Sequence, residues 1–298
     1  MKAICVGHST FDITIPMTEY PKENMKYRLS GHIDCGGGPA SNGAFLLAKW
    51  GVDTIIASVV GDDYYGERII NEFKDIGANI TYLEKKKNHR TTSSYIITNM
   101  SNGTRTVLSS KDTPIRKITR NIDIVADAIL LDGEHPETAK EVLNNNKKAI
   151  SVLDAGRLNE DTKELGKMVT YLVCSKNFAE EFTNREIDIS KLDELKAIYN
   201  ELEDFFQTNI VITLESLGSF ARIDDVCKII PSIKVKALDS TGAGDIFHGA
   251  FVYFISNGYS LYETIHLASI TAAISVERIG SRNSIPSLNE VFERDRSF

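Results

Sequence analysis

The stretch that decides the fold is DSTGAGDIFHGAF, residues 239–251. Gly242, Ala243 and Gly244 carry little or no side chain, so a ligand could approach the backbone closely here. The apolar residues that follow predict a helix whose first turn would leave these N–H groups without a partner in the chain. Unpaired N–H groups at the positive end of a helix dipole favour a phosphate. Asp245 follows directly, where a carboxylate could accept a proton from an incoming hydroxyl.

A glycine-rich turn capped by an acid is the structural alternative to a phosphate site. Three features of the sequence weaken that alternative. The preceding run 229–237 has the composition of a strand, and two acids, Asp239 and Asp245, flank the loop. The predicted helix also carries Gly249 and Ala250, which suit close packing against another element.

In full, the stretch resembles the C-terminal signature of the ribokinase-like (PfkB) carbohydrate kinases, and the resemblance continues over nearly the whole chain. It implies that Asp245 is the catalytic base and that the amides of Gly242, Ala243 and Gly244 form the anion hole. It also implies an α/β fold, a three-layer sandwich with a mainly parallel central sheet. Residues 1–298 would form one kinase domain, with a small β lid from about 13–34 and 91–110.

Composition narrows the classes of function. A chain of 298 residues with 42% hydrophobic content can bury a large core, and its net charge of −7 argues against a nucleic-acid surface. The short basic cluster 85–90 therefore reads as a solvated loop. The longest apolar run, 246–255, is too short to span a bilayer, and the amino terminus shows no signal peptide, so we expect a cytoplasmic protein without a membrane partner. The four cysteines are far apart and read as reduced thiols.

The first third of the chain predicts a buried strand, a helix and a hairpin. Residues 1–6 form an apolar run, and Asp12 follows where an open α/β sheet places groups that hydrogen-bond a sugar, although an acid capping a turn is the alternative. Residues 13–30 are polar and suit a small sheet outside the core. The runs 91–99 and 105–109, around the turn 101–103, predict a β-hairpin.

A second glycine cluster, CGGGPASNGA at residues 35–44, precedes a mostly apolar pattern that predicts a helix as far as Gly51. The cluster does not match the G-x-G-x-x-G of dinucleotide sites. It resembles the N-terminal signature of the same kinase family, which implies that Gly37, Gly38 and Asn42 hold the sugar. The family alignment also implies a sugar contact for Glu134.

From residue 122 onward, short apolar runs alternate with polar segments of helical character, which predicts βαβ units. The expected strands are 128–131, 150–153, 171–174 and 210–214. Polar residues follow each one, and the carboxyl ends of parallel strands should gather them on one rim. One such pair, Asp154 and Arg157, suits either substrate binding or a plain salt bridge.

The resemblance implies further residues for the nucleotide and for metal ions. Asn177 and Glu180 spell an N-x-x-E motif that would organise Mg²⁺, but a competing alignment places Ser175 and Phe178 at these two positions, and a solvated helix acid is a third interpretation. The resemblance implies that ATP is bound by Ser175, Thr213, Gly218 and Ser269. It also implies that six residues supply oxygen ligands for K⁺: Asp239, Thr241, Ser275, Arg278, Gly280 and Ser284.

Together these features predict an ATP-dependent kinase that transfers the γ-phosphate to a hydroxyl of a small sugar. The segment 20–27, the Gly-Gly-Gly-Pro-Ala form of the second cluster and Ser175-Lys176 resemble the branch that contains ketohexokinase and sulfofructose kinase. That branch implies a ketose such as fructose. A ribokinase or nucleoside kinase on the same fold and a non-catalytic sugar- or nucleotide-binding regulator stay open as alternatives. The resemblance also suggests a homodimer formed through the lid.

Overall fold

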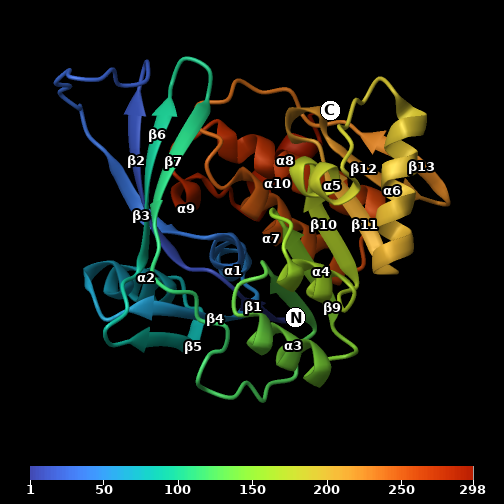
Figure 1. Cartoon of the computed structure of the whole chain (residues 1–298), viewed down its shortest axis with the longest axis horizontal. Helices are drawn as coiled ribbons and strands as arrows, with labels where there is room; N and C mark the ends of the chain where they lie inside the picture. Colours follow the sequence, from blue (N-terminus) through green and yellow to red (C-terminus); the bar gives the residue numbers. More distant parts are fainter. Residues whose placement is uncertain (298) are drawn as a thin grey trace.

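The structure is a computed structural model that describes residues 1–297 (Figure 1). Its strands are β1 (Lys2–Val6), β2 (Thr10–Met17), β3 (Ile33–Gly37), β4 (Asp53–Gly61), β5 (Asn79–Lys86), β6 (Thr92–Asn99), β7 (Thr104–Ser110), β8 (Ala128–Leu131), β9 (Ile150–Ala155), β10 (Tyr171–Ser175), β11 (Asn209–Thr213), β12 (Ser219–Ile223) and β13 (Val226–Ile230). Its helices are α1 (Pro39–Lys49), α2 (Tyr64–Asp75), α3 (Pro136–Asn145), α4 (Glu160–Gly166), α5 (Lys176–Thr183), α6 (Leu192–Phe206), α7 (Ala243–Ser256), α8 (Leu261–Val276), α9 (Ser281–Ser284) and α10 (Leu288–Asp295).

A large sheet forms the centre of the molecule, with strand order β13-β12-β11-β10-β9-β8-β1-β4-β5. The pairs β11–β12 and β12–β13 are antiparallel, and the pairs from β11 to β5 are parallel. Strand β1 lies inside the sheet, with Ile4 level with Ile55 of β4 and Ile129 of β8. The predicted α/β architecture with a mainly parallel sheet is therefore confirmed.

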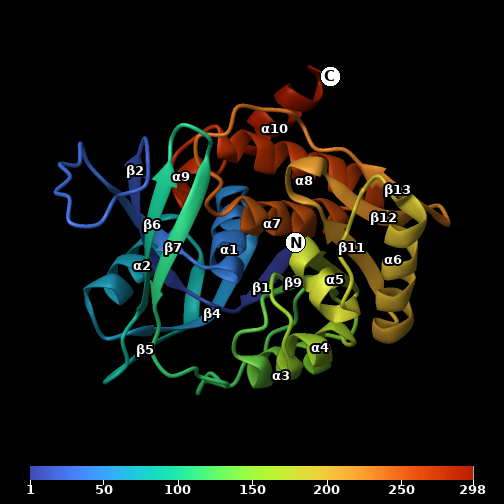
Figure 2. The same cartoon turned by 45° about the horizontal axis from the view of Figure 1, so that its top comes forward.

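Helices cover both faces of this sheet and produce three layers (Figures 1 and 2). Alternate residues of β1 show the division: Ala3 and Cys5 belong to a core with helices α1, α2, α7 and α8, whereas Ile4 and Val6 belong to a core with helices α3 to α6. A strand buried on both faces must be apolar at every position, which explains the continuous run at the amino terminus.

A second sheet, β3-β2-β6-β7, forms the predicted lid beside the first. Strands β6 and β7 make the expected hairpin, and β2 pairs with β6 in parallel. Two details differ from the sequence-based prediction. Residues 18–32 contain no strand, and Asp12 lies within β2 of the lid instead of in the loop after β1. Lid formation therefore depends on β2 pairing with β6, a segment some eighty residues away that local patterns do not indicate.

Two other local predictions hold only in part. The run 229–237 is not a strand throughout, because β13 ends at Ile230 and an irregular segment leads into the glycine loop. Pro231 begins that segment and has no N–H for a sheet bond. The basic cluster is also more ordered than predicted: Lys85 and Lys86 end the edge strand β5. Charged residues on an edge strand disfavour pairing with another chain.

Within residues 1–297, no helix is both long and apolar enough to cross a bilayer. The four cysteines are free thiols, as expected from their spacing. Cys5, Cys35 and Cys174 are buried, and Cys227 is partly exposed.

Helices α1 and α7 cross at two glycines, and this crossing places the two glycine clusters beside each other. A Cβ atom on Gly249 would lie 2.8 Å from the Cα of Gly43 and 3.2 Å from its carbonyl oxygen. Because these atoms belong to the backbone, a side chain at residue 249 would force the helices apart. The small residues of the signature thus have a packing role in addition to any contact with a ligand.

We expect Gly249→Ala to destabilise the protein by about 1–2 kcal/mol. Overpacking costs roughly 1–3 kcal/mol, and the better helix propensity of Ala returns at most about 1 kcal/mol. Chemical denaturation measures the difference. The matched control is Gly244→Ala in the same helix, where a Cβ would have no neighbour within 4 Å. A Gly249→Ala protein as stable as the wild type would contradict the packing argument.

Candidate active site

The glycine loop ends at the N-terminus of α7, as predicted. Gly242 is the N-cap residue and has φ 75°, a left-handed conformation that favours glycine. The N–H of Ala243 donates to the Ser240 carbonyl over 3.3 Å. Within residues 1–297, the N–H groups of Gly242, Gly244 and Asp245 have no protein acceptor. The free donors are therefore two of the three predicted amides, together with the amide of Asp245 itself.

The carboxylate of Asp245 meets the second glycine cluster. Asn42, in the first turn of α1, donates from Nδ2 to Asp245 Oδ2 over 2.7 Å. Burial raises the pKa of Asp245, while the Asn42 hydrogen bond and the charges of His248 and Arg105 work against that rise. A carboxylate whose pKa is raised in this way is a stronger base than a solvated one, as general base catalysis requires.

Asp12 and the paired glycines lie next to this carboxylate. Gly37 allows the approach, because a Cβ there would overlap Asp12 Oδ2 at 2.0 Å. Gly38 has φ 98° and precedes α1 as its N-cap residue. Burial raises the pKa of Asp12 to about 6, and the nearby charge of Asp245 adds to the rise, although the Thr10 hydroxyl opposes it. The structure therefore brings together the predicted group Asp12, Gly37, Gly38, Asn42 and Asp245.

Asp132, which the sequence analysis did not select, holds the backbone around this group. Its Oδ2 accepts from the N–H of His8 over 2.8 Å and from the N–H of Ala40 over 3.0 Å. Its Oδ1 accepts from the N–H of Glu134 over 3.0 Å. One carboxylate thus fixes the end of β1, the start of α1 and the loop after β8. Its position directly after a predicted strand was the available signal, but three backbone partners cannot be read from one residue.

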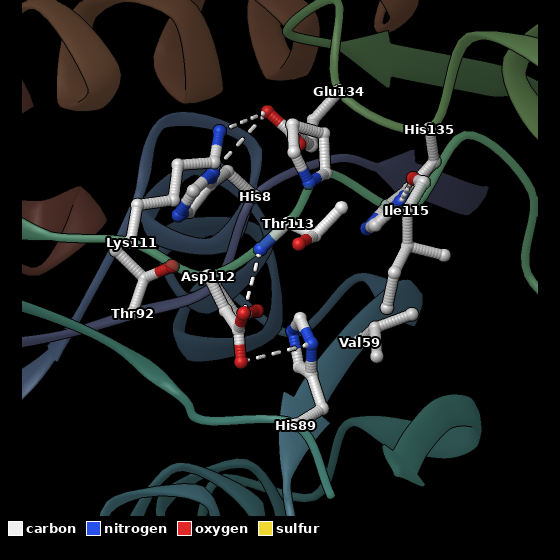
Figure 3. Close-up of a pocket in the computed structure, with 12 residues that line it drawn as sticks. His8, Val59, His89, Thr92, Lys111, Asp112, Thr113, Ile115, Glu134 and His135 are labelled. Carbon is white, nitrogen blue, oxygen red and sulfur yellow. Dashed lines mark hydrogen bonds and ion pairs between the residues drawn. The ribbon is translucent and has the colours of Figure 1, made fainter.

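Glu134 faces a neighbouring pocket instead of the Asp245 carboxylate (Figure 3). Lys111 donates to Glu134 Oε2 over 2.8 Å, and His8 Nδ1 lies 3.4 Å from the same oxygen. Burial works to raise the pKa of Glu134, but these two hydrogen bonds outweigh it and lower the pKa to about 2. Glu134 is therefore ionised at neutral pH. The pocket continues past Thr92 of the lid to Asp112, His89 and Ile115 and is partly open to solvent.

Asp239 connects the glycine loop to the segment before α9. Its Oδ1 accepts from the N–H and hydroxyl of Thr241, at 2.9 and 2.6 Å, and its Oδ2 accepts from the N–H of Gly280 over 2.9 Å. Thr98 of the lid strand β6 lies 3.4 Å from Oδ1. The buried carboxylate therefore joins both segments that the resemblance assigns to a monovalent cation.

The other predicted ligands of that cation lie in the glycine loop and in the segment from the end of α8 to α9, which Asp239 connects. Ser275 and Arg278 lie at and just beyond the end of α8, where the Arg278 N–H donates to the Ser275 carbonyl over 3.0 Å. Ser284 is buried and donates to the Ser281 carbonyl over 2.7 Å. The carbonyls of Thr241 and Gly280 accept no hydrogen bond within the described residues. A buried carboxylate with free carbonyls nearby is a donor set that suits a hard cation.

The lid contacts the glycine loop directly. Arg105 of β7 donates from Nη1 to the carbonyl and hydroxyl oxygens of Ser240, at 3.0 and 2.6 Å. The Ser240 hydroxyl donates in turn to the carbonyl of Gly103, in the turn of the lid hairpin. The position of the lid is therefore mechanically linked to the loop that presents the free N–H groups.

The predicted nucleotide positions lie at the carboxyl ends of two adjacent strands and on α8. Ser175 closes β10 level with Thr213 of β11, and its hydroxyl caps α5 by accepting from the N–H of Phe178. Gly218 has φ 109°, and a Cβ there would meet the Ile230 carbonyl at 2.1 Å. Ser269 is buried, and its hydroxyl donates to the Ile265 carbonyl over 2.8 Å. Its hydroxyl is thus already engaged within the helix.

The two side chains predicted for Mg²⁺ are not arranged as a pair of ligands. Asn177 is exposed on α5, and Glu180 Oε1 accepts from the N–H of Ile187 over 2.7 Å, with Lys176 Nζ 3.5 Å away. Among residues 1–297, no three His, Cys, Asp or Glu side chains form a metal-binding group. The helix cap at Ser175 favours the competing alignment, in which the buried Phe178 occupies the position of the glutamate.

Asp154 does not pair with Arg157, which is exposed. Its partner is His248 of α7, whose Nδ1 lies 3.1 Å from Asp154 Oδ2. Both side chains are buried. The sequence could not indicate this pair, because the two residues are about a hundred positions apart and meet only when α7 packs on the sheet.

Free N–H groups at a helix start, next to a buried carboxylate, are suited to transferring an anionic group to a hydroxyl. The comparisons with known proteins agree with this class. The chain belongs to the pfkB family of carbohydrate kinases, whose family model matches residues 2–288. It is thus a kinase and a transferase, which confirms the family and the enzyme class expected from the two glycine clusters.

Ribokinases and nucleoside kinases are among the proteins similar to this chain. The chain is 29% identical to a ribokinase of Schizosaccharomyces pombe over 86% of this chain and 85% of that protein. It is 26% identical to a nucleoside kinase of Methanocaldococcus jannaschii, and the match covers 98% of this chain and 96% of that protein. Its fold matches the structure of Arabidopsis thaliana ribokinase complexed with ribose and ATP, with a TM-score of 0.76 and 21% identity. The match covers 98% of this chain and 97% of that one. Similarity thus lies with ribokinases and nucleoside kinases instead of the predicted ketohexokinase branch.

We expect Asp245→Asn to lower kcat by about 10²–10⁴-fold, the usual contribution of a general base, because an amide cannot accept the hydroxyl proton. Steady-state kinetics and a nucleotide-binding titration measure the change, and nucleotide affinity should stay nearly constant. Asp225→Asn, in the exposed turn between β12 and β13, is the matched control. Undiminished turnover in a folded Asp245→Asn protein would remove Asp245 from the mechanism.

Proposed function

We propose that the protein transfers the γ-phosphate of ATP to a hydroxyl of a small ribose-type sugar, with Asp245 as the base. The observation that carries the proposal is the position of Asp245: it is hydrogen-bonded to Asn42 and stands in the same helical turn as the free amides. A non-catalytic regulator would have no need for a buried carboxylate at this point.

In the proposed reaction the sugar hydroxyl oxygen attacks the γ-phosphorus as the bond from that phosphorus to the bridging oxygen of ADP breaks. Asp245 accepts the hydroxyl proton. The N–H groups of Gly242, Gly244 and Asp245 face the charge that develops on the transferred group, where fixed donors are most effective. Asp12 and Asn42 orient the sugar, because a carboxylate and an amide supply acceptors and a donor at short range.

ATP would lie between the carboxyl ends of β10 and β11 and the start of α7, beside Ser175, Thr213 and Gly218. Support comes from the ATP present in the Arabidopsis ribokinase structure of the same fold. Mg²⁺ would accompany the nucleotide, held mainly by its phosphates and by water, as is usual for this ion. The engaged carboxylate of Glu180 and the exposure of Asn177 make those two residues weak candidates as direct ligands.

Ribose is favoured over a ketose by the relatives, because those named above include ribokinases. A nucleoside is the second candidate, because the archaeal nucleoside kinase aligns over almost the whole chain.

Two further features belong to this proposal. The whole chain would work as one kinase domain, with the four-stranded sheet as the lid over the sugar. A homodimer through that lid would cover the exposed apolar side chains of Tyr95 on β6 and Leu108 on β7. These two residues pair across the strands, so their side chains lie on the same face of the small sheet.

We expect kcat/KM for ribose to exceed that for fructose at least tenfold, which corresponds to about 1.4 kcal/mol of transition-state discrimination. The measurement is ATP-dependent turnover with ribose, deoxyribose, adenosine, inosine and fructose. A preference for fructose would restore the ketose assignment. A preference for a nucleoside would replace ribose by the second candidate. ATP-dependent turnover of none of these substrates would overturn the ribose proposal.

We also expect K⁺ to raise turnover, and Na⁺ to do so less, because a cation bound at Asp239 would order the loop that carries the free amides. The structural support is the buried carboxylate that joins this loop to Gly280. Rates are compared in K⁺, Na⁺ and a large organic cation at matched ionic strength. Equal rates in K⁺ and in the organic cation would discard the cation site.

A further inference from the structure

Below the free amides, α7 presents a histidine to three oxygen acceptors. His248 Nδ1 lies 2.6 Å from the carbonyl oxygen of Gly244 and 3.1 Å from Asp154 Oδ2. On the other side of the ring, Nε2 lies 3.1 Å from the carbonyl oxygen of Val173, on β10. His248 and Asp154 are 5% and 7% exposed, so water does not compete freely for these contacts.

This geometry decides the protonation state of the ring. A neutral imidazole carries one N–H, so one of its nitrogens would direct a lone pair at an oxygen. If Asp154 carried the proton instead, its carboxyl group could donate to an unprotonated Nδ1. The lone pair of that nitrogen would then still face the carbonyl oxygen of Gly244. A doubly protonated ring donates to all three acceptors, with the Nδ1 proton shared between Gly244 and Asp154. Burial raises the pKa of Asp154, and the charge of His248 opposes that rise.

One peptide bond connects the Gly244 carbonyl, which His248 contacts, to the N–H of Asp245. The carbonyl of Gly244 belongs to the peptide unit whose N–H is the free donor of Asp245. A cation on that carbonyl polarises the unit, and polarisation of this kind strengthens the donor at its other end. The contacts of His248 with Asp154 and Val173 also hold the second turn of α7 against β9 and β10.

We propose that His248 and Asp154 form a buried imidazolium–carboxylate pair that positions the Gly244–Asp245 peptide and keeps Asp245 ionised. His248 is a positioning residue, because it acts through this peptide and does not contact the substrate. The inference rests on the proposed role of Asp245. The groups that face Asp245 are Asn42 from α1, His248 from α7, Arg105 from β7 and Asp132 after β8, and its charge also reaches Asp12 on β2 and Asp154 on β9.

The charge of the ring is tested without reference to activity. Two-bond ¹H–¹⁵N correlation spectra of the full-length protein with ¹⁵N-labelled histidine separate imidazolium from neutral rings, and the His248→Asn variant identifies the His248 signals. At pH 8 a histidine with the ordinary pKa is neutral. We expect His248 to remain doubly protonated there, and Asp154→Asn to make it neutral. A neutral His248 ring in the wild-type protein at pH 8 would overturn the proposal.

The effect on Asp245 is tested by kinetics with a matched pair of variants. His248→Asn should lower kcat about tenfold or more, since fixed donors at such sites are worth up to 10²–10³-fold. It should also move the acid limb of the kcat profile to higher pH, because removal of a nearby positive charge makes Asp245 easier to protonate. His266→Asn, whose ring contacts Asp295 on the far side of α8, should change neither. If the acid limb of folded His248→Asn protein did not move, the positioning role would be contradicted. If the wild-type protein phosphorylated no sugar but its His248 ring were doubly protonated, only the proposed function would be refuted.

Discussion

The hydrogen bond from Asn42 to Asp245, 2.7 Å long, is the constraint on which the rest of the site depends. It joins the first turns of α1 and α7, which come from opposite ends of the chain. The bond forms only because the two helices approach at Gly43 and Gly249, where a Cβ on Gly249 would lie 2.8 Å from the Cα of Gly43. Asp132 fixes the start of α1 by accepting from the N–H of Ala40. The side-chain amide of Asn42 is therefore held by Asp132, through the start of α1, and by Asp245 on α7.

A second set of contacts makes the lid part of the same machinery. Arg105 and Thr98 reach from β7 and β6 to Ser240 and Asp239, so a movement of the lid must move or release the glycine loop. Sugar binding under the lid could in this way influence the amides that face the phosphate. The coupling needs no long pathway, because the two strands touch the loop itself.

Local patterns predicted most of the architecture, because apolar runs and glycine clusters express short-range rules. The hairpin of β6 and β7, the strands β8 to β11 and the helix after the loop are confirmed. The errors share a different cause. Asp12 was placed on a strand end because β2 is recognisable only through its pairing with β6, and Asp154 was matched to Arg157 because His248 approaches from a distant helix. The sequence signatures thus indicated residues that gather beside the glycine loop, but only the packed chain shows which partners hold them.

The electrostatics of the site explain why its anion-binding groups come from the backbone. Acids surround the loop: Asp12, Asp132, Asp154, Asp239 and Asp245. Within residues 1–297, the basic side chains that contact the loop are Arg105, at Ser240, and His248, at the Gly244 carbonyl. A bare polyphosphate would meet repulsion from these carboxylates, which low dielectric strengthens. Two of them, Asp132 and Asp239, are occupied in accepting backbone N–H groups. The free amides of α7 supply positive potential at one point only. Such a site would concentrate its own attraction on a single phosphoryl group.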